Sequence, residues 1–191
     1  MNRYSQAIRL IKSDFNRYHS LSRDCREMPK KFSTFLSKQG KWRFLIRLLI
    51  HDSGFKFLIW FRLTAAKGPL FLFNWLMYMH YTRKYHILLP YHTKVGSGLY
   101  LGHGMCIVVN PTATIGNNVS ISQFVNIGSN KGHAAIIEDG VYLAPHVCLI
   151  ENVRIGQHSV IGAGAVVTKD IPPYSVAVGV PAKVIKSIDK S

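Results

Sequence analysis

The most regular pattern in the chain is an aliphatic residue that returns every six positions. A small residue often follows it, as in Ile115-Gly116 and Leu143-Ala144. This period fits neither the helix repeat of about 3.6 residues nor the simple alternation of a strand. The positions fall into three registers, which are Val95, Leu101, Ile107, then Val109, Ile115, Ile121, Ile127, then Ile137, Leu143, Leu149, Ile155, Ile161, Val167.

A period of six predicts a β-solenoid, in which each hexad makes one short strand and one corner. The aliphatic side chain points inward and stacks on its equivalent in the next coil. The small residue after it lets the backbone turn without a Cβ clash. We therefore expect a mainly β solenoid domain over residues 87–186.

The segments before the solenoid are expected to be helical. In residues 3–18, Ile8, Ile11 and Phe15 share one helical face. Residues 19–41 are expected to form a connector with at most one short helix. The segments 42–50 and 55–63 are rich in large apolar residues, and 69–81 carries no formal charge and opens with Pro69, which suits a first helical turn. Residues 1–86 are thus expected to form an α-helical region.

The end of the chain is expected to close the solenoid. After Val167, the pair Pro172-Pro173 ends regular coiling, and VAVGVPAKVIK predicts a closing strand that covers the open end. A solenoid needs such a cap to avoid association edge to edge. Residues 187–191 are expected to be a short tail.

The positive charge of the chain is concentrated in its first half. Residues 1–94 carry 18 Lys and Arg against 4 Asp and Glu, whereas residues 95–191 carry 6 against 5. An anionic partner is therefore expected at the first half. No recognised nucleic-acid module is present, so we expect no nucleic-acid binding.

Two interpretations of the apolar segments 42–50, 55–63 and 69–81 remain open. They are too short for the roughly 20 apolar residues that span a bilayer. They could form helices that pack on the solenoid or on a neighbouring subunit. They could equally lie on an anionic membrane surface, with Lys and Arg among lipid headgroups.

The three cysteines form no paired framework and no CxxC motif. The first residues lack the apolar run of a secretory signal. We therefore expect a reducing cytoplasm, with peripheral attachment to the inner face of the plasma membrane as the finer hypothesis.

The hexad pattern is interrupted twice, and each interruption carries a histidine. The register slips by two between Ile107 and Val109, just after Gly102-His103-Gly104. Between Ile127 and Ile137 four extra residues bulge outward around His133. Insertions in a solenoid form loops on one face, and such loops often carry function.

Two runs of the sequence resemble a known family. HGMCIVVNPTATIGNNVSISQFVNIGSNKG and GAGAVVTKDIPPYSVAVGVPAKVI are similar to the serine acetyltransferase branch of the hexapeptide-repeat acyltransferases. They are closer still in style to polysaccharide O-acetyltransferases of the colanic-acid type. The resemblance covers about residues 90–186. It implies a left-handed parallel β-helix, a homotrimer or a dimer of trimers, and acetyl-CoA as the acetyl donor.

The same resemblance implies roles for individual residues. His103 aligns with the general base, and an imidazole with a pKa near 6.5 suits that role at neutral pH. His133 aligns with a second histidine, on a loop that contacts the acceptor. The acceptor site is expected to include Gly102, Asn130 and Lys131, and the CoA site is expected to include Ala144, Gly162, Ala163, Lys169 and Lys183.

The chain also departs from serine acetyltransferases. Positions at which those enzymes carry two aspartates and an arginine hold Leu88, Gly102 and Gly132 here. A free amino acid needs charged partners for both its amino group and its carboxylate, and these departures remove them. The sequence therefore favours a neutral sugar hydroxyl as acceptor.

A metal site is not expected. Related solenoids with zinc use a His-x4-His pair, and no such pair occurs among His103, His133, His146 and His158. The last two are expected on different faces of the solenoid.

The resulting hypothesis is an acetyl-CoA-dependent O-acetyltransferase that acts on a sugar of a cell-surface polysaccharide or of its lipid-linked precursor. Transfer is expected to be direct, because no serine or cysteine lies in a nucleophile motif. The alternative within enzymes is a serine O-acetyltransferase of cysteine biosynthesis. The alternative outside enzymes is a solenoid scaffold that binds a partner protein.

Overall fold

The computed structural model describes residues 3–24, 40–130 and 132–189. Within these residues four helices come first, and short strands follow from Ile87 onward. The helices are α1 (Arg3–Asp24), α3 (Lys41–His51), α4 (Ser53–Ala65) and α5 (Phe71–Tyr85). The strands are β1 (Ile87–Leu88), β2 (Lys94–Val95), β3 (Tyr100–Leu101), β4 (Ile107–Val109), β5 (Thr114–Ile115), β6 (Ser120–Ile121), β7 (Asn126–Gly128), β8 (Ile136–Ile137), β9 (Tyr142–Leu143), β10 (Cys148–Ile150), β11 (Arg154–Ile155), β12 (Val160–Ile161), β13 (Val166–Val167), β14 (Ser175–Val178) and β15 (Lys183–Ser187).

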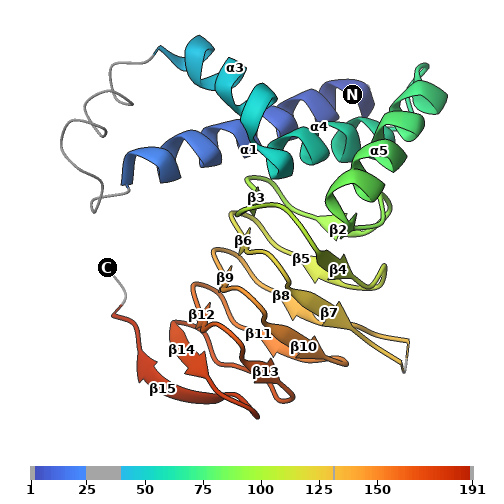
Figure 1. Cartoon of the computed structure of the whole chain (residues 1–191). Helices are drawn as coiled ribbons and strands as arrows, with labels where there is room; N and C mark the ends of the chain where they lie inside the picture. Colours follow the sequence, from blue (N-terminus) through green and yellow to red (C-terminus); the bar gives the residue numbers. More distant parts are fainter. Residues whose placement is uncertain (1–2, 25–39, 131, 190–191) are drawn as a thin grey trace.

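The strands wind into a left-handed parallel β-helix with three sheets (Figure 1). Sheet A has the order β1-β4-β7-β10-β13, sheet B has the order β2-β5-β8-β11, and sheet C has the order β3-β6-β9-β12-β14-β15. All neighbouring strands are parallel except β14 and β15, which pair antiparallel. The fold class predicted from the six-residue period and the resemblance is confirmed.

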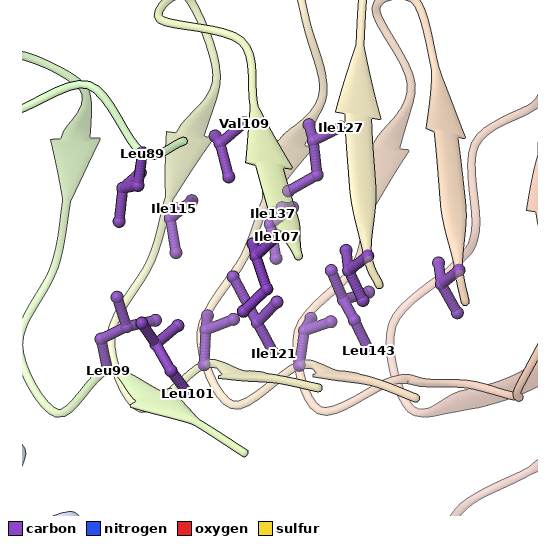
Figure 2. Close-up of a cluster of buried hydrophobic side chains, with 14 of the residues drawn as sticks. Leu89, Leu99, Leu101, Ile107, Val109, Ile115, Ile121, Ile127, Ile137 and Leu143 are labelled. Atoms are coloured by element: carbon purple, nitrogen blue, oxygen red, sulfur yellow. The ribbon is translucent and has the colours of Figure 1, made fainter. Parts of the chain in front are cut away.

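The aliphatic residues of the hexads line the inside of the coils. Figure 2 shows a cluster of these buried side chains, and each coil stacks on the next, as Ile121 does on Leu143 in the pairing of β6 with β9. Every residue of the three registers is almost fully buried except Val95, which is half-buried in the first coil. Burial of one aliphatic side chain contributes about 1.5–3 kcal/mol, so the repeated pattern determines the fold.

The helices cover the open end of the first coil (Figure 1). Helix α4 lies between α1 and α5 and is the core of this layer, because Phe55, Phe57, Leu58 and Phe61 are each at most 1% exposed. In the structure the segment 55–63 thus packs on the solenoid. A side chain buried in this way is not available to a lipid surface.

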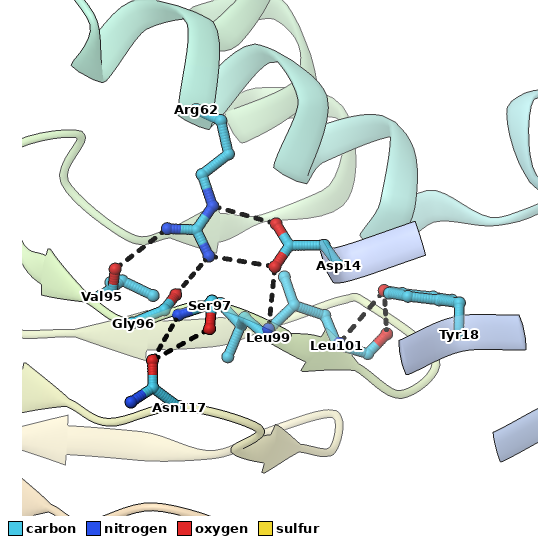
Figure 3. A network of polar contacts seen from close by, with 9 residues as sticks. All are labelled: Asp14, Tyr18, Arg62, Val95, Gly96, Ser97, Leu99, Leu101 and Asn117. Atoms are coloured by element: carbon cyan, nitrogen blue, oxygen red, sulfur yellow. Dashed lines mark hydrogen bonds and ion pairs between the residues drawn. The ribbon is translucent and has the colours of Figure 1, made fainter. Parts of the chain in front are cut away.

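A buried polar network joins the helices to the first coil (Figure 3). Arg62 of α4 forms an ion pair with Asp14 of α1, at 2.9 Å, and also donates to the backbone carbonyls of Val95 and Gly96. Asp14 accepts a hydrogen bond from the backbone N–H of Leu99. These contacts satisfy backbone groups at the end of the solenoid, where no further coil can do so.

Tyr18 of α1 adds to this network. Its hydroxyl donates to the carbonyl of Leu101 and accepts from the N–H of the same residue. Burial raises the pKa of the Tyr18 phenol well above its ordinary value, and the nearby charge of Asp52 adds to the shift. The phenol therefore stays neutral and holds α1 on strand β3.

Three element boundaries differ from the sequence-based expectation. Helix α1 continues to Asp24, beyond residue 18, because its last turns pack on α3, with the rings of His19 and Phe44 5.2 Å apart. Helix α5 begins at Phe71, so Pro69 lies in the preceding turn. The closing strand is a hairpin of two strands, β14 and β15. The rest of the predicted connector, residues 25–39, lies outside the described residues.

Candidate active site

His103 lies in a corner that is two residues longer than its equivalent in the next coil. Leu101 pairs with Ile121 and Val109 pairs with Ile127, which leaves the extra residues between β3 and β4. This corner joins sheet C to sheet A, and we call this edge of the solenoid the C–A edge. His103 is exposed there and has a φ of 53°, a conformation that is uncommon outside glycine.

The start of α4 packs directly against the loop that carries His103. A Cβ on Gly104 would lie 2.5 Å from the Cα of Gly54 and 2.6 Å from its nitrogen. Only hydrogen atoms fit at this contact, so both positions require glycine. The packing fixes the histidine loop against the N-terminus of a buried helix.

A cavity of about 700 Å³ opens beside His103. Helices α1 and α3 form one side of it, and the outward-facing residues of sheet C form the other. Its lining combines aromatic and aliphatic side chains with charged and polar ones. The lining residues are Arg17, Tyr18, Leu21, Ser22, Phe44, Arg47, Leu48, His51, Asp52, Tyr100, His103, Ser120 and Tyr142.

Asp52 is an acidic residue that lines the same cavity as His103. It caps α4 by accepting a hydrogen bond from the Phe55 N–H at 2.7 Å. Burial raises the pKa of Asp52, while the Phe55 N–H and the charges of Lys56 and His103 oppose that rise. Asp52 is the only acidic residue among the described residues that line the cavity, so it supplies the negative charge there beside His103.

The second interruption forms the loop 129–135 between β7 and β8, at the edge between sheets A and B. Ile127 and Ile137 are ten positions apart there, against six for Val109 and Ile115. Glu151 accepts hydrogen bonds from the Ser129 hydroxyl and the Asn130 N–H, at 2.9 and 3.2 Å. His133 is exposed on this loop.

The two histidines therefore lie on different edges of one chain. His103 lies on the C–A edge and His133 on the A–B edge, and the cavity at His103 does not include His133. Of the predicted acceptor-site residues, Gly102 is buried beside His103 and Asn130 is exposed on the loop of His133. Lys131 lies outside the described residues.

Most residues predicted to contact CoA follow the C–A edge below His103. Ala144 and the pair Gly162-Ala163 occupy this edge in successive coils, where the N–H of Ala144 donates to the backbone carbonyl of Ile161. Lys183 of β15 is close to them, because it pairs with Val178, whose side chain a Cβ on Gly162 would meet at 2.6 Å. Lys169 lies instead on the A–B edge.

Sequence reasoning missed the residues that the helices bring to the cavity. Arg17 and Asp52 are far from His103 in the chain, and neither belongs to a motif. The spacing of Arg17 from Asp14 and Tyr18 does place it near one helical face, but nothing in the sequence indicates what that face meets.

The described residues contain no group of three or more His, Cys, Asp or Glu side chains that could hold a metal ion. His146 lies on the C–A edge with its ring stacked on Phe124, and His158 lies on the edge between sheets B and C, stacked on Tyr174. The two histidines thus occupy different edges, as their spacing predicted.

Comparison with known proteins agrees with the resemblance. Residues 134–169 match the family model described as bacterial transferase hexapeptide (six repeats). The chain is 41% identical over 100 residues to the mitochondrial serine acetyltransferase 3 of Arabidopsis thaliana, and 38% identical over 100 residues to the serine acetyltransferase of Escherichia coli strain K12. Each match covers 50% of this chain, but only 26% and 37% of the two relatives.

Solved structures match over nearly the whole chain. The serine acetyltransferase of Neisseria gonorrhoeae in complex with serine superposes with a TM-score of 0.74 and 26% identity, covering 94% of this chain and 69% of that one. A serine acetyltransferase in complex with CoA has a TM-score of 0.74 at 21% identity, covers 96% of this chain and 72% of that one, and shares the fold. The resemblance to hexapeptide-repeat acyltransferases, and to their serine acetyltransferase branch, is confirmed.

Proposed function

We propose that this chain, whose β-helix resembles those of hexapeptide-repeat serine acetyltransferases, is an acetyl-CoA-dependent O-acetyltransferase with His103 as general base. The observation that carries the proposal is the cavity at His103, which adjoins the C–A edge where Ala144, Gly162 and Ala163 lie. An acceptor in the cavity and a thioester along this edge would meet at the histidine. A scaffold that only binds a partner protein would not need this arrangement.

The mechanism requires one proton carrier. His103 takes the proton of the acceptor hydroxyl as that oxygen attacks the thioester carbon. When the carbon–sulfur bond breaks, His103 returns the proton to the thiolate, so the acceptor gains an acetyl ester and CoA leaves as a thiol. General base catalysis of this kind contributes about 10²–10⁴-fold. The carboxylate of Asp52 favours the imidazolium that forms between the two steps.

The comparisons favour serine over a polysaccharide as the acceptor to test first. The relatives are named serine acetyltransferases, and one structure contains serine, whereas none of those compared above is named for a sugar. The prediction of a sugar acceptor rested on the absence of charged residues at the positions of Leu88, Gly102 and Gly132. The cavity weakens that argument, because the helices supply other charged groups, among them Arg17 and Asp52.

A trimer would bring the two histidines together. His103 and His133 lie on neighbouring edges on either side of sheet A, so one copy's C–A edge can face the next copy's A–B edge across a threefold axis. Lys169, on the A–B edge, would then approach CoA from the neighbouring copy. Within one chain Lys169 lies on a different edge from the other predicted CoA residues, and the trimer would bring it to the CoA site of the neighbouring copy.

Contact with a membrane surface remains a prediction. No helix among the described residues is long and apolar enough to cross a bilayer. Helices α3 and α5 do expose apolar side chains, among them Trp42, Ile50 and Leu72, and the first half of the chain is strongly basic. These features are compatible with peripheral binding to anionic lipid at the cytoplasmic face, or with packing between subunits.

The proposal is tested by thiol release from acetyl-CoA with L-serine and with oligosaccharides as acceptors. His103→Ala should lower kcat/KM by about 10²–10⁴-fold with the best acceptor. His158→Ala is the matched control, because that histidine is exposed on another edge, and its variant should keep the wild-type rate. Residual activity of His103→Ala above a tenth of wild type would exclude His103 as the base.

A further inference from the structure

Arg17 is a cation with unused hydrogen-bonding capacity in the candidate active site. Its Nε is buried and has no hydrogen-bond partner among the described residues. Its Nη2 makes only a long hydrogen bond, 3.4 Å, to the hydroxyl of Ser120. A buried donor without a partner costs about 1–3 kcal/mol, so such a group is expected to have a function.

The neighbouring acids do not neutralise Arg17. Asp14 lies one turn earlier on α1, but both of its oxygens bind Arg62. Asp52 is the only acidic residue among the described residues lining the cavity, and it caps α4. Arg17 therefore forms no ion pair with an acid among the described residues.

Arg17 lies on the side of the site where the acceptor is proposed to bind, away from the residues predicted to contact CoA. It reaches the outward face of sheet C at Ser120 of β6, on the side that α1 and α3 cover. The predicted CoA residues Ala144, Gly162 and Ala163 lie at the C–A edge of later coils. An anionic group bound by Arg17 would share the cavity with His103.

We infer that Arg17 binds a carboxylate of the acceptor while His103 removes the proton of that acceptor's hydroxyl. The inference rests on the proposed acetyl transfer and adds the substrate class, a hydroxyl compound that carries a carboxylate. A guanidinium presents a planar pair of N–H groups that matches the two oxygens of a carboxylate. Arg17 thereby supplies the positive charge that is missing at Gly132.

Two kinds of acceptor carry this chemistry. Serine is the smaller, and a sugar acid is the larger. A cavity of about 700 Å³ exceeds what serine requires, and the rings of Tyr18, Phe44, Tyr100 and Tyr142 in its lining suit the face of a sugar ring. The two sources are distinguished by matched pairs of acceptors with and without the carboxylate.

The kinetic experiment compares L-serine with L-serinamide, and D-glucuronate with D-glucose, for wild type and Arg17→Met. The variant should raise KM by about 10- to 100-fold for the carboxylate acceptor that the wild type uses, because it loses a charge-assisted hydrogen bond. KM for acetyl-CoA and for the neutral acceptor should not change. An equal loss with acid and amide, or a rise in KM for acetyl-CoA alone, would overturn the inference.

Two further variants exclude a loss of fold as the cause. Arg17→Lys keeps the charge but loses the paired N–H groups, so its KM should lie between those of wild type and Arg17→Met. Arg9→Met removes an exposed arginine of the same helix and should leave every constant unchanged. Thermal melting of each variant reports whether α1 stays docked.

A binding measurement separates this inference from the proposed reaction. In the His103→Ala background and without acetyl-CoA, calorimetry should detect the carboxylate probe, L-serine or D-glucuronate, and Arg17→Met should abolish that binding. Carboxylate binding without transfer by the wild type would leave the subsite correct and the proposed reaction wrong. Transfer that Arg17→Met does not change would leave the reaction correct and the subsite wrong.

Discussion

The two corners that interrupt the hexads differ in what surrounds them. The corner of His103 lies under the helices, next to the start of α4, and opens into a cavity. None of the described helices lies over the loop 129–135, and side chains of the solenoid itself hold it, through Glu151 and Thr112. Both corners carry a histidine, yet among the described residues only the first has charged side chains of the helical region around it.

This difference shows that an insertion in a solenoid does not by itself make an active site. An exposed histidine on a hydrogen-bonded loop has a defined place but no enclosure, and water surrounds it. Enclosure by α1 and α3 buries the carboxylate of Asp52 near His103 and strengthens their interaction. Among the described residues no helix gives the loop of His133 a comparable environment, and the proposed trimer would supply one from a second copy of the chain.

The largest expected effect is on the contact that holds the helices to the solenoid. Asp14→Ala leaves Arg62 buried without its partner, so the free energy of unfolding should fall by about 3–5 kcal/mol. The matched control is Glu138→Ala, which removes the partly exposed pair with Arg154, at 3.3 Å, and should cost about 0–1 kcal/mol. Urea denaturation measures both. Equal losses in the two variants would mean that burial does not determine the cost.

A smaller effect is expected where α4 meets the histidine loop. Gly104→Ala places a methyl group against the backbone of Gly54, so we expect a loss of about 1–3 kcal/mol together with a lower acetyl-transfer rate, because His103 moves. The control is Gly128→Ala, at the start of the loop that carries His133. A Cβ there would meet only Asn126 Oδ1, at 3.4 Å, so this variant should keep its stability. A normal rate for Gly104→Ala would show that the cavity tolerates displacement of the loop.

The loop of His133 should respond more weakly to loss of its anchor. Glu151→Gln weakens the hydrogen bonds from Ser129 and Asn130, and a typical hydrogen bond contributes about 0.5–1.5 kcal/mol. We expect faster hydrogen exchange at the Asn130 amide and little change in the melting temperature. Unchanged exchange at this amide would mean that the other contacts of the loop are sufficient.

The smallest effect concerns the regular part of the solenoid. The N–H and side-chain amide of Asn117 donate to Asp139 at 2.7 and 3.1 Å, and they lower the pKa of that carboxyl below 3.8. The charged form therefore adds stability above pH 3.8, and this contribution is lost as the pH falls through the lower pKa of the folded state.

Asp139→Asn tests that contribution. The difference in unfolding free energy between wild type and this variant should be largest near neutral pH and should shrink below pH 3.8. Urea denaturation across this range measures it. A difference that grows in acid would contradict the assigned direction of the pKa shift.

The sequence predicted the solenoid well because its signal is local and repeated. The inward residue of each hexad is buried in the same kind of core, so the pairing of Ile121 with Leu143 follows from their positions in the repeat. The breaks at His103 and His133 were visible for the same reason. The helix boundaries were less well predicted, because the last turns of α1 depend on contacts with α3.

The sequence by itself determined the coils, their breaks, the basic first half and the resemblance that points to His103. The tertiary structure alone decided which residues surround that histidine. Arg17 and Asp52 reach the cavity through the packing of α1 and α4 on the first coil, and this packing depends on buried contacts of Asp14 and Arg62 with each other and with the backbone of that coil. No spacing in the chain encodes such contacts, because they join segments whose separation in sequence follows no period.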